Sequence, residues 1–63
     1  RAEDSFVPYF KHMLAYIILG AFEVQNRLLE KGDALLLQNA SEVEFEALSN
    51  GALILLLDLP SLQ

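Results

Sequence analysis

Apolar and polar residues alternate most regularly at residues 42–47, Glu-Val-Glu-Phe-Glu-Ala. Successive side chains of a strand point to opposite faces, so this pattern predicts a strand with Val43, Phe45 and Ala47 on its apolar face. A helix would bury glutamates together with these three residues. We therefore expect a strand that has one face in the core and one face in water.

Two apolar runs without such alternation lie at residues 13–19 and 52–59. The second run follows the turn residues Ser49-Asn50-Gly51 and ends before Pro60, which has no N–H group to donate to a sheet. Continuous apolar strands are typical of sheets that are covered on both faces. The pattern thus predicts a buried strand at 13–19 and a strand covered on both faces at 52–59.

Residues 10–28 also fit an amphipathic helix, because apolar residues recur there at spacings of three and four. A helix would place Gly20 in its interior, at a cost of about 1 kcal/mol relative to alanine. The strand interpretation instead makes Gly20 a bend or bulge and places Phe22 and Val24 inside. It also accommodates the large apolar residues that lie off the helical stripe, which are Tyr16, Ile18, Leu19 and Phe22.

Turn signals divide the middle of the chain into short segments. Gln25-Asn26-Arg27 predicts a turn, since asparagine tolerates the left-handed backbone that tight turns require. A corner follows at residues 30–33, where we expect a positive φ at Gly32, and it leads into a short strand at 34–37. About five or six short strands separated by turns predict an all-β fold of barrel or sandwich type. Residues 1–12 are interpreted as a lead-in segment, 13–60 as the domain and 61–63 as a tail.

Composition and charge limit the possible partners. Of 63 residues, 54% are hydrophobic, and this surplus predicts that another domain or a dimer mate covers part of the surface. Nine acidic residues against four basic ones give a net charge of −5, so nucleic acid is not an expected partner. Cysteine is absent, which excludes disulfides and favours the cytoplasm. The longest apolar run falls short of the ~20 residues that span a bilayer, so we expect no membrane segment.

The glycine spacing and the closing segment resemble a known family. Gly20 and Gly32-Asp33 bracket a turn with Glu-Val before it and Leu-Leu after it, which resembles the second half of a cupin barrel. The acidic alternating strand and residues 52–60, Ala-Leu-Ile-Leu-Leu-Leu-Asp-Leu-Pro, look like the C-terminal cupin of pirin-like proteins. The resemblance covers residues 13–60 and implies a cupin-like jelly-roll barrel, or part of one, within a longer protein.

Pirin-like proteins are bicupins, with two stacked barrels in one chain. The resemblance implies an N-terminal cupin, not contained here, that holds an iron-type divalent metal through histidines and a glutamate. Some members open the ring of quercetin-like flavonols with dioxygen, as quercetin 2,3-dioxygenases do, and eukaryotic members act as nuclear regulators of transcription factors. The C-terminal cupin of such proteins usually lacks metal ligands.

The ligand pattern of a metal cupin is missing from this chain. Such a site takes two closely spaced histidines and a glutamate before the glycine matched by Gly20, and one more histidine after the corner at Gly32. No histidine follows Gly32. The upstream places are taken by Phe6, Pro8, Tyr9 and Met13. We therefore predict no catalytic, cofactor-binding or metal-binding residue in this chain.

Two isolated polar residues invite a functional interpretation. His12, the only histidine, could be a ligand or a general base, but a metal needs further ligands and no carboxylate follows before Glu23. We interpret it as an exposed or edge residue between Lys11 and Met13. Asp58 interrupts an apolar run, where a buried charge needs a partner, and we expect a salt bridge to Arg27, to Arg1 or to a missing domain.

The remaining candidates have structural interpretations. The alternating glutamates Glu42, Glu44 and Glu46 are expected to form a solvated outer face that discourages edge-to-edge aggregation, in place of a cation site. Asp33 is expected to hydrogen-bond backbone N–H groups at its corner. Aromatic residues that could stack on a flat ligand are more typical of a core, and they are Phe6, Tyr9, Phe10, Tyr16, Phe22 and Phe45.

Taken with the resemblance, these patterns predict a non-catalytic C-terminal cupin with a structural and docking role beside a metal-dependent N-terminal cupin. A second hypothesis is a small β interaction module that dimerises through an edge strand and binds a protein or an apolar ligand without catalysis. A third is a helical partner-binding fragment built on residues 10–28.

Overall fold

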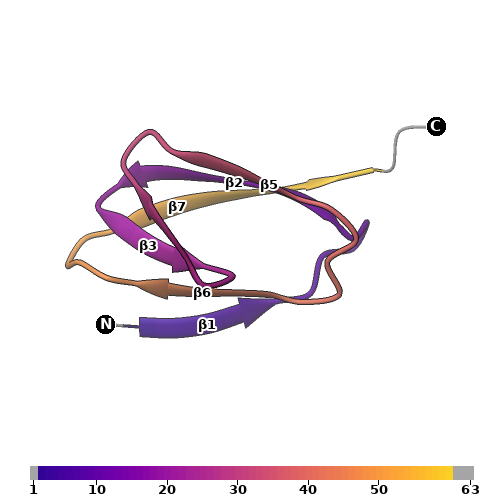
Figure 1. Ribbon diagram of the computed structural model, residues 1–63, viewed down its shortest axis with the longest axis horizontal. Helices are drawn as coiled ribbons and strands as arrows, with labels where there is room; N and C mark the ends of the chain where they lie inside the picture. Colours follow the sequence, from indigo (N-terminus) through magenta and orange to yellow (C-terminus); the bar gives the residue numbers. More distant parts are fainter. Residues whose placement is uncertain (1, 61–63) are drawn as a thin grey trace.

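The computed structural model describes residues 2–60, which fold into seven strands in two sheets (Figure 1). One sheet has four strands in the order β1-β6-β3-β4, and the other has three in the order β5-β2-β7. All pairings are antiparallel. The predicted all-β fold is therefore confirmed. In chain order the strands are β1 (Ala2–Phe6), β2 (His12–Leu19), β3 (Ala21–Val24), β4 (Arg27–Glu30), β5 (Ala34–Leu37), β6 (Val43–Ala47) and β7 (Leu53–Leu59).

The core lies between the two sheets and follows the period-two pattern of the strands. β2 contributes alternate residues from one sheet, and β3, β4 and β6 contribute from the other. No polar or charged side chain of the described residues is buried. The buried residues of this core are Met13, Ala15, Ile17, Phe22, Val24, Leu29 and Val43, of which Leu29 is the most exposed at 8%.

The β3–β4 hairpin turns through Gln25 and Asn26, whose φ values of 50° and 66° are those of a type I′ turn. The side-chain amide of Gln25 donates to the carbonyl of Glu42 at 3.1 Å, and its oxygen accepts from the N–H of Glu44 at 2.8 Å. These bonds tie the turn to the beginning of β6 and explain why glutamine occupies a left-handed position. The turn predicted at this place is confirmed.

Gly20 takes the chain from one sheet to the other, between β2 and β3. Its φ is +74°, and a Cβ atom built on it would lie 2.9 Å from the Cβ of Ala52 and closer still to the Oγ of Ser49. That hydroxyl oxygen accepts a hydrogen bond from the N–H of Ala21 at 3.2 Å. Both the backbone and the available space therefore require glycine, and the predicted bend at Gly20 is confirmed. A separate irregularity in the β2–β7 ladder lies between Ile17 and Leu19.

The corner at residues 30–33 returns the chain to the three-stranded sheet. Gly32 has a φ of +90°, as expected. The N–H of Glu30 donates to the Asp33 carboxylate at 2.8 Å, and the N–H of Asp33 donates to the carbonyl of Glu30 at 2.8 Å. The corner is also bonded to β2, because the N–H of Gly32 donates to the carbonyl of Ile17 at 2.8 Å. The interpretation of Asp33 as a corner residue is confirmed.

The structure corrects the sequence analysis at the amino end. The lead-in segment contains a strand, β1, which pairs along its whole length with β6 and brings the number of strands to seven. The sequence of β1, Ala-Glu-Asp-Ser-Phe, has no alternating apolar face, and Glu3, Asp4, Ser5 and Phe6 are exposed. The hydrogen bonds of the ladder, rather than apolar burial, position this edge strand, so hydrophobic periodicity does not reveal it.

The helical alternative for residues 10–28 is wrong, because β2, β3 and β4 begin within this range. Gly20 and the Gln25-Asn26 turn divide the segment at the points where a helix would have to continue. None of the described residues belongs to a helix that is long and apolar enough to cross a membrane.

Candidate functional site

Many of the exposed apolar side chains lie together on the outward face of the three-stranded sheet. Every second residue of β2, β5 and β7 turns away from the core and contributes to it. The register aligns them in rows, since Leu14 lies between Leu36 and Leu57, and Tyr16 lies between Ala34 and Leu55. We call this surface the apolar outer face, and it consists of Leu14, Tyr16, Ile18, Leu36, Leu53, Leu55 and Leu57.

This face contradicts the prediction that residues 52–59 are covered on both sides. Ile54 and Leu56 are half-buried against the core, whereas Leu55 and Leu57 are each 42% exposed and Leu53 is 49% exposed. The reason is that residues 2–60 form only two layers, so within the described part of the chain no third layer lies against the outer side of the three-stranded sheet. An apolar strand of this kind is typical of a sheet that packs on something else.

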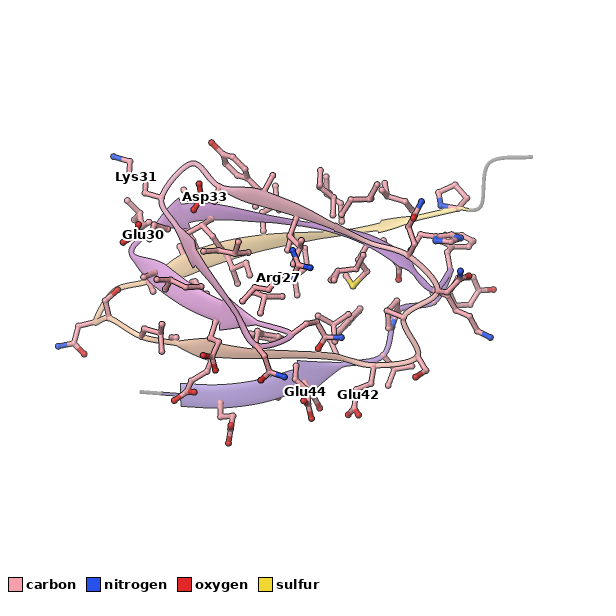
Figure 2. All side chains as sticks on the ribbon, in the orientation of Figure 1. Arg27, Glu30, Lys31, Asp33, Glu42 and Glu44 are labelled. Carbon is pink, nitrogen blue, oxygen red and sulfur yellow. The ribbon has the colours of Figure 1, made fainter. Side chains whose placement is uncertain are left out.

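The outer face of the four-stranded sheet is acidic. Its register places Glu46 directly opposite Glu3 on one side and opposite Glu23 on the other. Together with Glu44, these residues line an open hollow of about 50 Å³. Figure 2 shows Glu42 and Glu44 pointing away from the body of the molecule. Glu42 and Glu44 are exposed as predicted, whereas Glu46 is half-buried. The sequence analysis missed that Glu3 and Glu23 extend the acidic face across neighbouring strands.

Two of the positions at which the resemblance expects metal ligands are buried apolar residues in this structure. Met13 is 1% exposed in the core, and Pro8 is also buried. Among residues 2–60, no three His, Asp or Glu side chains are grouped closely enough to hold a metal ion. His12 is half-buried at the start of β2, where its Nδ1 atom accepts a hydrogen bond from the N–H of Asn39 at 3.4 Å. Because β2 is the central strand of the three-stranded sheet, the interpretation of His12 as an exposed or edge residue is wrong.

Asp58 binds backbone groups. Its two carboxylate oxygens accept hydrogen bonds from the N–H of Tyr9 at 2.6 Å and of Phe10 at 3.0 Å. The expected salt bridge to Arg27 is therefore replaced by two backbone donors, and Arg1 lies outside the described residues. Asp58 fixes the loop between β1 and β2 to the end of β7. Only the three-dimensional register places this carboxylate near residues that are almost fifty positions away.

The aromatic residues divide between core and surface. Phe22 is 4% exposed and Phe45 is half-buried, as expected for core residues. Tyr9 is 84% exposed, and its ring meets that of Phe10 edge to face with centroids 4.8 Å apart. Phe6, Phe10 and Tyr16 are also exposed, so the core interpretation is wrong for these residues. They lie on the β1–β2 side of the molecule or on the apolar outer face, where packing within the described chain does not cover them.

Comparison with known proteins places most of the chain in one family. Residues 8–59 match the quercetinase C-terminal cupin domain. No curated protein and no solved structure matches the chain. The matched range begins in the loop after β1 and ends with the last residue of β7, so it includes both layers of the sandwich.

Proposed function

This chain belongs to the family of quercetinase C-terminal cupin domains, and from that membership we propose that it is a non-catalytic cupin that docks on a second, metal-dependent cupin barrel. The proposed partner is an N-terminal barrel of quercetin 2,3-dioxygenase-like type. Docking uses the apolar outer face, and the role of the chain is to support the barrel that carries the metal.

The exposure of the apolar outer face is the observation that carries this proposal. Monomeric proteins rarely leave contiguous apolar surface of more than a few hundred Å² in water. Here the exposed side chains lie in register on three rigid strands, and Tyr16 presents a ring with a polar tip at their centre. Aromatic and aliphatic side chains held in this way are typical of the central part of a protein interface.

The acidic outer face of the four-stranded sheet also supports docking through the three-stranded sheet. Glu3, Glu23, Glu44 and Glu46 share that face, so burying it would place several like charges in a region of low dielectric constant. The sheet with the apolar outer face therefore meets the partner, and the four-stranded sheet remains in water. The negative face also disfavours nucleic acid as a partner, and the absence of cysteine supports a reducing compartment such as the cytoplasm.

A binding experiment tests the docking. The chain is labelled with ¹⁵N and titrated with the separately produced N-terminal barrel of the same protein, and amide shifts are followed by NMR. We expect the largest changes on β2, β5 and β7. Tyr16→Lys should weaken binding at least tenfold. The matched control is Leu28→Lys, because Leu28 is 62% exposed on β4 of the acidic sheet. Equal losses from both variants, or shifts centred on β6 and β1, would contradict the proposal.

A metal analysis tests the non-catalytic role. The purified chain is incubated with iron(II) or nickel(II), passed through a desalting column and analysed by elemental mass spectrometry. We expect a metal content far below one ion per chain, because one histidine does not complete a coordination sphere. One bound ion per chain that is lost in His12→Ala would overturn the proposal.

A further inference from the structure

Beyond its outer face, the three-stranded sheet has an open edge along β7. Within residues 2–60, β2 is the only strand that pairs with β7, so one side of this seven-residue strand has free N–H and C=O groups. In Figure 1, β7 runs toward the carboxyl end of the described chain. A long, flat edge with free backbone groups is a template for pairing with another strand.

The other three edges carry features that discourage such pairing. β1 presents Glu3 and Asp4, and β4 carries Arg27 and Glu30 at its ends. β5 is an apolar edge of only four residues. By contrast, the first five residues of β7, Leu-Ile-Leu-Leu-Leu, contain no charge, proline or glycine. Short strands and charged side chains usually protect the edge of a sheet against pairing with another chain. The first five residues of β7 have no charge, and the strand is the longest of the four edges.

We propose that β7 pairs in antiparallel fashion with β7 of a second copy of this chain, about a two-fold axis at Leu55. This register places Leu53 opposite Leu57 of the other copy, and the reverse pair follows by symmetry. The two three-stranded sheets then become one continuous six-stranded sheet. Leu53, Leu55 and Leu57 of both copies share one side of it, because opposed residues in a ladder lie on the same face.

The position of Asp58 selects the antiparallel direction. In the antiparallel pair each Asp58 lies three residues from the axis, so the two carboxylates are separated along the strands by about 20 Å. A parallel pair would set them side by side and add like-charge repulsion. The carboxylate of Asp58 is also held by the N–H groups of Tyr9 and Phe10, which turns it toward the β1–β2 loop. A second copy matches the edge in length and apolar character, because the five uncharged residues of β7 are centred on Leu55 and oppose one another in the antiparallel register.

The pairing does not depend on the docking proposed above, because it uses the edge of the sheet and not its face. The continuous sheet leaves both apolar outer faces open on one side. Two docked barrels would then be held on the same side of a dimer. Either proposal can therefore fail while the other stands.

Backbone methylation tests the edge directly, and a chain of 63 residues is accessible to chemical synthesis. Neighbouring residues of an edge strand point their N–H groups to opposite sides, so of Leu55 and Leu56 one donates toward β2 and the other toward the free edge. We expect the unmodified chain to dimerise in sedimentation equilibrium. N-methylation at the edge-facing residue should raise the dimer dissociation constant at least tenfold and leave the urea midpoint of the monomer unchanged. Methylation at its neighbour should lower that midpoint.

Two side-chain variants separate the edge from the face. Leu55→Lys places two lysines opposite each other at the proposed axis and should weaken the dimer at least tenfold. Leu36→Lys, on the same apolar outer face but on β5, should weaken docking of the N-terminal barrel and leave the dimer intact. A chain that stays monomeric at millimolar concentration would overturn the proposal. A dimer that survives both N-methylations and Leu55→Lys would overturn it as well.

Discussion

The two sheets of this protein share one kind of inner face and differ in their outer faces. Both present alternate apolar residues to the core, with Ala15 and Ile17 from one sheet meeting Val24 and Val43 from the other. On the outside, the four-stranded sheet carries glutamates, whereas the three-stranded sheet carries leucines and Tyr16. One sheet thus has an acidic outer face, and the other has an apolar outer face that no strand of the described residues covers.

This difference teaches how to interpret an apolar run. Alternation at residues 42–47 predicts which face of the strand is buried and which is exposed, because polar residues occupy the face in contact with water. A continuous run such as 52–59 says only that both faces are apolar. Whether the second face is covered depends on how many layers pack together, and the described residues form two.

The sharpest way to break the comparison is to truncate neighbouring residues on the two faces of β2. Ile17 is fully buried and Ile18 is 36% exposed. Ile17→Ala should destabilise the chain by about 2–5 kcal/mol, since it leaves a cavity in a small core. Ile18→Ala should cost less than about 1 kcal/mol. Urea denaturation followed by circular dichroism measures both, and similar losses would show that the outer face is packed in the isolated chain.

The link between the two sheets should be nearly as sensitive as the core. Gly20→Ala forces an alanine to a φ of +74° and against Ser49 and Ala52, so we expect a loss of about 2–4 kcal/mol. Gly32→Ala is the matched control, because Gly32 has a φ of +90° but nothing within 4 Å of the added atom. It should cost about 1–2 kcal/mol. Thermal and urea unfolding of both variants would reveal the order, and a reversed order would contradict the close packing at Gly20.

The half-buried carboxylate of the three-stranded sheet is the next test. Asp58→Ala leaves the N–H groups of Tyr9 and Phe10 without their acceptor, which should cost about 1–3 kcal/mol. Hydrogen exchange at these two amides should accelerate. Asp4→Ala on the exposed strand β1 should change stability by less than about 0.5 kcal/mol. Unchanged exchange at Tyr9 and Phe10 in Asp58→Ala would show that Asp58 does not hold the loop.

The smallest effect is expected on the acidic sheet, and it has the opposite sign. Glu23 lies opposite Glu46, so Glu23→Gln should stabilise the chain by about 0.2–0.5 kcal/mol at low salt. The gain should shrink at 1 M salt because exposed charges are screened. Glu30→Gln is the control, since Glu30 lies opposite Ala21 and has no acidic neighbour across that ladder. A loss of stability in Glu23→Gln would mean that the glutamate face is not repulsive.

Most of the fold could be predicted from local signals. Alternation identifies β6, and turn residues identify the Gln25-Asn26 hairpin and the Gly32 corner. These features depend on the preferences of a few neighbouring residues. β1 could not be predicted, because its position depends on the ladder that it forms with β6 and its own side chains are mostly polar and exposed.

The candidate site was predicted only in outline. The surplus of apolar residues indicated that a partner covers some surface, but the sheet on which that surface lies follows from the register of β2 with β5 and β7. The partners of Asp58 were predicted incorrectly for the same reason. Its carboxylate accepts hydrogen bonds from the backbone N–H groups of Tyr9 and Phe10. Almost every residue has such a group, so the sequence does not reveal which ones act as donors.

The strand order also determines how this chain reaches its native state. Only β3 and β4 are neighbours both along the described chain and within a sheet. The other strand pairs join residues that are far apart in the sequence, such as Ala2 with Ala47 and His12 with Leu59. Such topologies must close long loops before any contact compensates for the lost chain entropy, so they fold slowly, in milliseconds to seconds. We expect the β3–β4 hairpin, with its Gln25 anchor, to form early, and the terminal strands to assemble last.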